Sequence, residues 1–213
     1  MRTIITLIAL SFALTLTGCS STRIAIGEAF GHAKREQLVD RVEEARDGQE
    51  AAKVQFASAL DEFLALTGTD GGDLEAAYKK LSKQYDRSKS KAETVRSRIR
   101  SVERVADALF AEWDKELGEY SSDELRRASE RQLTETRDRY DELLGAMKRA
   151  ESKMDPVLAA FGDQVLFLKH NLNARAIASL DTEAANLEAE IGRLIAEMEA
   201  SIKEANAFID DMK

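Results

Sequence analysis

Residues 38–63 read LVDRVEEARDGQEAAKVQFASALDEF. Apolar residues recur in this stretch at alternating steps of four and three, at positions 38, 42, 45, 52, 56, 59 and 63, and the polar Gln49 fills the one remaining step. This is the spacing of the buried stripe of a coiled-coil helix. Further apolar positions at Leu60 and Leu64 widen the stripe, which indicates a helix that packs against more than one neighbour.

The same spacing returns in three later segments, so the sequence predicts an all-α protein. These further stripes lie at positions 74, 78, 81, 85, 88, 92, 95, 99, 102, 106, 109 and 113, at 133, 136, 140, 143, 147, 150, 154, 157, 161, 165, 168 and 172, and at 180, 184, 187, 191, 194, 198, 201, 205 and 208. We expect long coiled-coil-like helices at about residues 27–66, 74–117, 122–178 and 181–211, the third of them kinked near Pro156. Their connections are short, which favours antiparallel neighbours. The predicted architecture is therefore an elongated antiparallel bundle of about four helices.

Turn-forming residues separate the predicted helices. Residues 67–73 and 118–122 contain the glycines that end the first two, and Ser121 with Glu124 has the pattern of a capping box for the third. Residues 181–183 are the expected junction before the last helix. Pro156 either kinks the third helix or, with Asp155 as N-cap, starts a new one.

Composition and net charge limit the classes of function that the chain can have. Pro occurs once and Gly eleven times in 213 residues, which suits long helices rather than sheet. The formal net charge is -8, so the chain repels phosphate backbones and we expect no nucleic-acid partner. Residues 27–34 hold two glycines and a lysine in the wrong spacing for a phosphate-binding loop, so we expect no nucleotide either.

The first nineteen residues predict where in the cell the protein is located. Residues 4–16 are uncharged and apolar, but thirteen residues span only about 20 Å as a helix, too short for a bilayer core of about 30 Å. Such a segment is typical of a cleaved signal peptide. It ends in Leu16-Thr17-Gly18-Cys19, which resembles the lipobox of bacterial lipoproteins. The alternative is an ordinary signal peptide followed by a chance cysteine.

The lipobox resemblance implies cleavage before Cys19, a diacylglyceryl thioether on its sulfur and an acyl chain such as palmitate on its amine. Ser20 after the cysteine points, by analogy with enterobacterial sorting, to the periplasmic face of the outer membrane, with the inner membrane less favoured. The predicted organisation is a signal peptide at 1–18, the lipidated cysteine and a short linker at 19–26, and the helical domain at 27–213.

The residues of the helical domain form no recognisable active site, so we expect a protein that is not an enzyme and binds no cofactor. His32 and His170 are far apart in the sequence, without the paired spacing of a metal site, so no metal is expected. Adjacent carboxylates such as Asp141 and Glu142 do not face each other on a helix and are typical of solvated surface. Trp113 falls on the apolar stripe and is expected in the core.

One stretch, residues 161–180, is apolar on nearly all sides of a helix and then becomes polar. This pattern indicates either an interior helix with a polar junction or a helix that a partner covers. The candidate partner-binding residues are the polar ones within it: Lys169, His170, Asn171, Asn173 and Arg175.

Four stretches carry a resemblance to a family. They are residues 30–42 (FGHAKREQLVDRV), 70–75 (DGGDLE), 154–158 (MDPVL) and the run from Leu168 to Leu180. With them the chain resembles the bacterial lipoproteins known as domain of unknown function 2959. The resemblance implies a helical envelope protein of Gram-negative bacteria and supplies no activity, cofactor or catalytic residue.

The leading functional hypothesis is a non-enzymatic, membrane-anchored scaffold or adaptor that binds other cell-envelope proteins through a helix surface. The alternative is a ligand-binding or envelope-stress regulatory module with a pocket between helices near His170.

Overall fold

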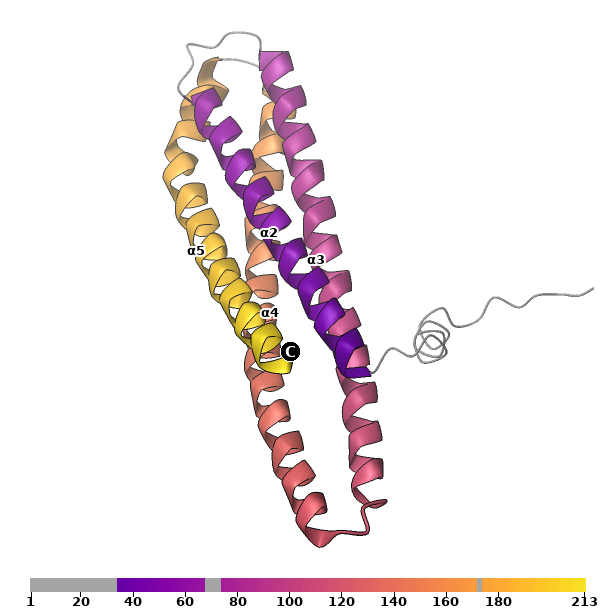
Figure 1. Ribbon diagram of the computed structural model, residues 1–213. Helices are drawn as coiled ribbons and strands as arrows, with labels where there is room; N and C mark the ends of the chain where they lie inside the picture. Colours follow the sequence, from indigo (N-terminus) through magenta and orange to yellow (C-terminus); the bar gives the residue numbers. More distant parts are fainter. Residues whose placement is uncertain (1–33, 68–73, 172–173) are drawn as a thin grey trace, which may run out of the picture. The chain divides into compact units, whose positions relative to one another are not determined.

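The computed structural model describes residues 34–67, 74–171 and 174–213, except for the side chains of residues 67, 174–179 and 181–182. Four helices make up this part of the chain (Figure 1). They are α2 (Lys34–Thr67), α3 (Leu74–Leu117), α4 (Asp123–His170) and α5 (Ala174–Met212). The predicted all-α class is confirmed.

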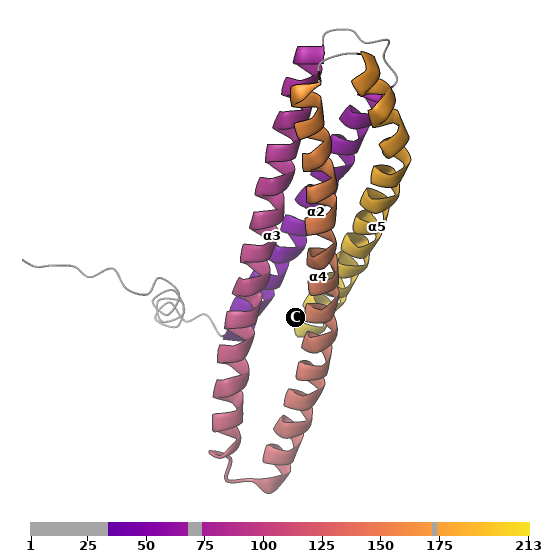
Figure 2. The ribbon, with the colours of Figure 1, turned by 180° about the vertical axis from the view of Figure 1, so that it is seen from behind.

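The helices of the unit 34–213 form a ring in chain order. α2 packs against α3 and α5, and α4 packs against the same two helices, as the opposite views of Figures 1 and 2 also show. The two ends of the unit close the ring, because Arg35 Nε donates to the Met212 carbonyl oxygen at 2.9 Å and Lys213 Nζ lies 3.0 Å from Glu43 Oε1. The unit is thus the predicted up-and-down antiparallel bundle.

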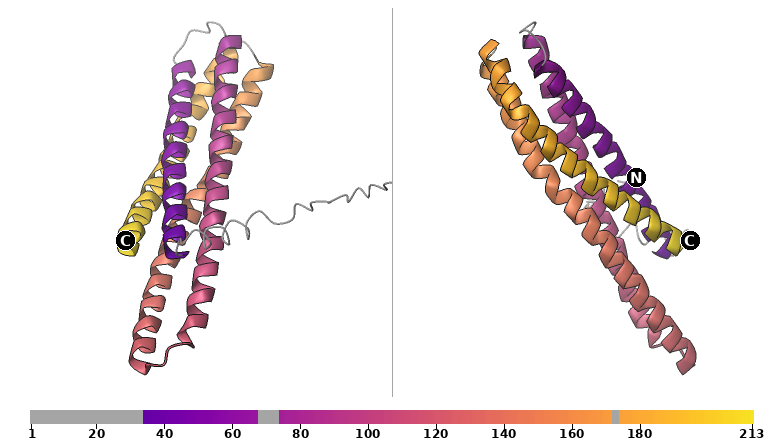
Figure 3. Two further views of the ribbon diagram at one scale, coloured as in Figure 1. Left: turned by 45° about the vertical axis from the view of Figure 1, so that its right-hand side comes forward. Right: turned by 90° about the vertical axis from the view of Figure 1, so that its left-hand side faces the viewer.

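The α3–α4 hairpin projects beyond the first residue of α2 and the last residues of α5 (Figures 1 and 3). Arg139 Nη1 lies 3.0 Å from Asp211 Oδ2, which places the end of α5 beside Arg139. The part of α4 that precedes Arg139 therefore extends past α5, for about 24 Å at 1.5 Å per residue. No side chain of residues 111–132 is buried, since beyond the first residue of α2, whose Lys34 Nζ lies 2.9 Å from Glu112 Oε1, only α3 and α4 pack together.

The predicted apolar stripes form the core. In α2, Gln49 and the seven apolar residues of the opening pattern are all buried, and in α5 every predicted stripe residue from Leu180 to Phe208 is buried. In α4 the stripe from Leu133 to Leu168 is buried as well. Four stripe residues of α3 are only partly buried against this core, namely Leu74, Tyr78, Tyr85 and Trp113. Helical spacing alone thus identified which face of each helix points inward.

The start of α4 differs from the predicted capping box. Ser122, not Ser121, is the N-cap: it has an extended backbone (φ −98°, ψ 118°), and its Oγ accepts a hydrogen bond from the Leu125 amide at 3.3 Å. Glu124 consequently lies in the first turn, where its charge and that of Asp123 favour the positive end of the helix dipole.

The predicted junction between the last two helices is wrong. The third helix ends at His170 rather than at 178, and α5 begins at Ala174 rather than at 181. Asn171 is the C-cap. Its backbone N–H donates to the Leu168 carbonyl oxygen at 3.2 Å, and its side-chain Nδ2 donates to the Phe167 carbonyl oxygen at 2.9 Å. Residues 181–183 lie inside α5, because buried residues on both sides, Leu180 and Ala184, hold that helix in the core.

Pro156 does not break α4, which runs from Asp123 to His170 through it. A proline inside a helix leaves one carbonyl without its amide partner and costs about 3 kcal/mol. Met154 is 0% exposed, Val157 2% and Leu158 7%, so buried side chains lie on both sides of the proline. Their burial offsets that cost and keeps the helix continuous.

Several predictions fall outside the described residues: the signal peptide at 1–18, Cys19 with its linker to residue 26, and the first turns of a helix from residue 27. They stay predictions. Among the helices that the structure describes, none combines the length and apolarity needed to cross a bilayer.

Candidate functional site

Three of the five candidate partner-binding residues, Lys169, His170 and Asn171, lie at the C-terminal end of α4. Lys169 and His170 lie in its last turn, where the positive charge of Lys169 is favourable at the negative end of the helix dipole. Both side chains are exposed, and Asn171 is half-buried. Asn171 uses its side-chain amide to cap the Phe167 carbonyl, so its first role is to end the helix.

Two apolar side chains lie exposed beside these polar residues. Leu166 is 54% exposed and Phe167 38%, whereas Val165 and Leu168 on the other face of the same turn are buried. The helix end is therefore not an interior helix, which was one of the two interpretations of its all-round apolarity. Large exposed apolar side chains next to cations and amides are typical of a surface that a partner covers. We call Leu166, Phe167, Lys169, His170 and Asn171 the α4-end patch.

The remaining predicted site residues are not placed by the structure. Asn173 and Cys19 lie outside the described residues, and Arg175 belongs to the first turn of α5 without a described side chain. The exposed pair Leu166 and Phe167 was missed as a site. Its signal is the run of four apolar residues at 165–168, which is more than one buried face of a helix can hold.

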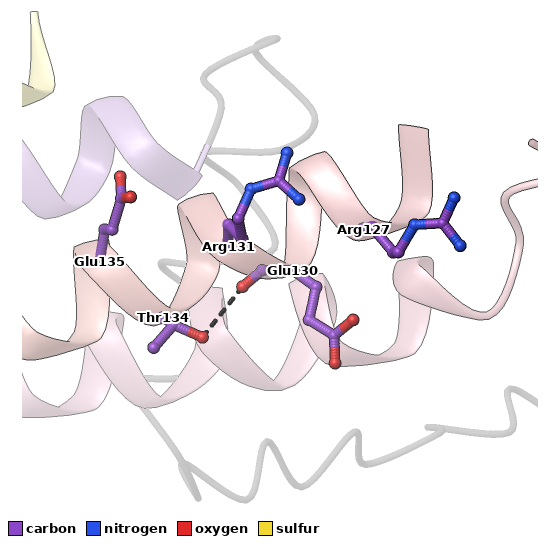
Figure 4. A pocket seen from close by; sticks show the side chains of 5 residues that line it. All are labelled: Arg127, Glu130, Arg131, Thr134 and Glu135. Atoms are coloured by element: carbon purple, nitrogen blue, oxygen red, sulfur yellow. Dashed lines mark hydrogen bonds between the residues drawn. The ribbon is translucent and has the colours of Figure 1, made fainter. Parts of the chain in front are cut away.

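A second surface feature is a shallow hollow on the projecting part of α4, lined by Arg127, Glu130, Arg131, Thr134 and Glu135 (Figure 4). Thr134 Oγ1 donates to the Glu130 carbonyl oxygen one turn earlier, at 3.0 Å, so this hydroxyl is engaged with the backbone. Neither guanidinium forms an ion pair within the described residues. Alternating charges on one open helix face offer no nucleophile held beside a base.

Within the described helices, one fully buried polar pair crosses between α2 and α5. Ser201 Oγ of α5 donates to Gln49 Oε1 of α2 at 2.8 Å, and both residues are 0% exposed. Gln49 Nε2 is also buried and has no hydrogen-bond partner. A buried polar residue at a core position of a coiled coil can specify register, so we expect this pair to favour one alignment of α2 against α5.

The seam of the projecting hairpin is held by aromatic residues. Trp113 Nε1 donates to Ser129 Oγ at 2.8 Å, and the Tyr120 hydroxyl lies 3.4 Å from the same oxygen. Trp113 packs against the core as a partly buried residue, in agreement with the expected structural role. The phenol of Tyr120 stays 44% exposed at the tip.

Among the titratable groups that the structure describes, the pKa values of Tyr140 and Lys148 are shifted, and both shifts have structural causes. Burial raises the pKa of Tyr140, and the nearby carboxylates of Asp107 and Glu103 raise it further, so the phenol stays neutral at physiological pH. Hydrogen bonding to Glu103 raises the pKa of Lys148. Among the residues described, no group of three His, Cys, Asp or Glu side chains is arranged to hold a metal ion.

Comparison with known families decides the affiliation of the chain. The family described as Protein of unknown function (DUF2959) matches residues 25–212, which is nearly the whole helical domain. The chain belongs to this family. The predicted family is thereby confirmed, the lipoprotein nature of the chain stays a prediction, and the family's description supplies no activity. A comparison with curated proteins gives no match.

Proposed function

We propose that this member of the family is a lipid-anchored scaffold or adaptor of the cell envelope, and not an enzyme. The lipobox at Leu16 to Cys19 supports the anchor, and Ser20 supports the outer membrane as its location. Acyl chains on one cysteine make attachment stable, at about 0.8 kcal/mol per buried methylene. The helical domain would then act close to the membrane surface.

The observation that carries the adaptor role is the α4-end patch. Leu166 and Phe167 expose apolar surface, and Lys169 adds a positive charge and His170 a polar imidazole at its edge. An apolar centre with a polar rim is the usual anatomy of a protein interface. A partner helix laid across this end of α4 would cover both apolar side chains.

The test is site-specific photo-crosslinking in cells, with the probe at Phe167 or Lys169 of the full chain. Lys203, an exposed residue of α5, is the matched control position. We expect a discrete envelope-protein adduct from both patch positions, and we expect Leu166→Glu to abolish the adduct from Lys169. Adducts no stronger than those from Lys203, or unchanged by Leu166→Glu, would exclude the adaptor role of this patch.

A further inference from the structure

Charge is strongly divided along α3 and its turn. Residues 79–104, the basic segment, contain ten Lys and Arg against three Asp and Glu, a net charge of +7. Residues 107–124, the acidic tip, contain seven Asp and Glu against one Lys, a net charge of −6. The net charge of the whole chain, −8, conceals this division.

Both segments carry charges that the bundle does not neutralise. Within the described part of the chain, Lys83, Arg87, Lys89 and Lys91 are exposed and form no ion pair. The same holds at the tip for Glu116, Glu119 and Glu124. By contrast, Arg96 and Arg100 of the basic segment have carboxylates within 4 Å.

One molecule cannot bring these two sets of charges together. Lys91 and Glu116 lie on the same continuous helix, about 37 Å apart along its axis at 1.5 Å per residue. At physiological salt, exposed charges are screened beyond about 8 Å. The opposite charges can therefore meet only between two copies of the chain.

We propose that two copies of this chain associate antiparallel along α3, so that the acidic tip of each lies on the basic segment of the other. A two-fold axis near the middle of α3 produces both contacts at once, because such an interface is self-complementary. The outward face of α3 is solvent-exposed along this length, so no helix has to leave the bundle (Figure 2).

Exposed apolar side chains support the same arrangement. The tip exposes Tyr120 at 44% and Leu125 at 59%. In the basic segment, Lys91 borders a shallow hollow that also contains Val54, which is 60% exposed on α2. Asp47 and Glu50 line this hollow too, but Arg46 and Lys53 lie 2.9 Å and 3.0 Å from them and balance their charge.

An anionic lipid surface would also attract the basic segment, but it would repel the acidic tip. A second copy is favoured because it uses both segments of the helix. The proposed contact lies on α3 and is separate from the α4-end patch. A negative result from photo-crosslinking at Phe167 would therefore leave the self-association untouched, and a chain that does not self-associate would leave the adaptor role untouched.

The first test is zero-length carbodiimide crosslinking of the full chain in detergent, as an equal mixture of unlabelled and ¹⁵N-labelled protein. We expect linked peptides that join Lys89 or Lys91 to Glu116 or Glu119 and carry one labelled and one unlabelled partner. A separation of about 37 Å or more within one copy rules out intramolecular formation of these links. Their absence under conditions where Lys79 and Glu75, 2.7 Å apart, are joined would overturn the proposal.

The second test reverses the charges. One variant combines Arg87→Glu with Lys91→Glu, and the other combines Glu116→Lys with Glu119→Lys. Each variant should lower the association between differently tagged copies roughly tenfold or more, because like charges then face each other. A 1:1 mixture of the two variants should restore association, since opposite charges meet again at both contacts. Arg193→Glu with Lys203→Glu, the same change on exposed α5 positions, should leave association unchanged.

Failure of the mixture to restore association would contradict the pairing of the two segments. A different outcome would identify a membrane, rather than a second copy, as the partner of the basic segment. In that case the chain would not self-associate but would bind vesicles of anionic lipid. This binding would be abolished by Arg87→Glu with Lys91→Glu and strengthened by Glu116→Lys with Glu119→Lys. The crosslinking test uses the unaltered chain, so it remains decisive even where a variant folds poorly.

Discussion

The buried pair between Gln49 and Ser201 makes a quantitative prediction for stability. Ser201→Ala removes the hydroxyl that donates to Gln49 Oε1 at 2.8 Å, and Nε2 of the same amide already has no partner. The whole amide is then buried without a hydrogen bond. Leaving one buried polar group unsatisfied costs about 1–3 kcal/mol. For a domain of this size each 1 kcal/mol corresponds to about 2–4 °C in Tm.

Gln49→Leu has the opposite expectation, because it removes the unsatisfied amide and fills the same core position with an apolar side chain. The Ser201 hydroxyl left behind can donate to a carbonyl one turn earlier in α5. We expect Gln49→Leu to change the free energy of unfolding by less than about 1 kcal/mol, or to raise it. Adding Ser201→Ala to Gln49→Leu should then cost almost nothing.

Urea unfolding followed by circular dichroism, on the chain from residue 20 onward, gives the four free energies of this cycle. The account predicts a coupling of about 1–3 kcal/mol between the two positions. Ser97→Ala, at an exposed serine of α3, is the matched control and should change stability by less than about 0.5 kcal/mol. Additive effects, or a Ser201→Ala chain as stable as the parent, would refute a functional hydrogen bond between α2 and α5.

Three further predictions concern pH, the proline and two glycines. Burial, then nearby carboxylates, raise the pKa of Tyr140 above its ordinary value of about 10. The unfolded chain therefore loses the phenolic proton first, and stability falls as the pH rises above about 10; Tyr140→Phe should reduce this loss in urea midpoints measured from pH 8 to 11. Pro156→Ala supplies the missing helical amide and should raise the free energy of unfolding, by at most about 3 kcal/mol; an unchanged or lower value would show that the proline fits α4 without cost. Gly162→Ala places a Cβ 3.1 Å from the Tyr85 ring, so the gain in helix propensity is offset by crowding and the variant should be about 1 kcal/mol less stable than Gly192→Ala. Gly192→Ala meets nothing within 4 Å and should raise stability by about 0.5–1 kcal/mol; equal thermal shifts for the two glycines would contradict the packing.

The apolar spacing predicted the helices well because their stability depends on burying one face. Every predicted stripe residue of α2 is buried, including the polar Gln49. The boundary between α4 and α5 was missed because the amide of Asn171, rather than a glycine or proline, ends α4. A cap made by one side chain leaves a weaker trace in the sequence than a glycine turn.

The candidate site was only partly predictable. Lys169 and His170 stood out by their polarity, but the exposure of Leu166 and Phe167 depends on which face of α4 meets its neighbours. A run of four apolar residues does not by itself say which two remain outside. The opposite charges of the two parts of α3 were hidden by summing over the chain, and they become informative once one continuous helix from Leu74 to Leu117 is known.

Attachment to lipid through Cys19 is the central claim of the proposed function, and mass analysis of the native protein's N-terminal peptide tests it most directly. We predict a peptide that begins at Cys19 and carries the mass of a diacylglyceryl group and an additional acyl chain. A chain that still begins at Met1, or a Cys19 with a free thiol, would contradict the proposed anchor and the envelope role that depends on it.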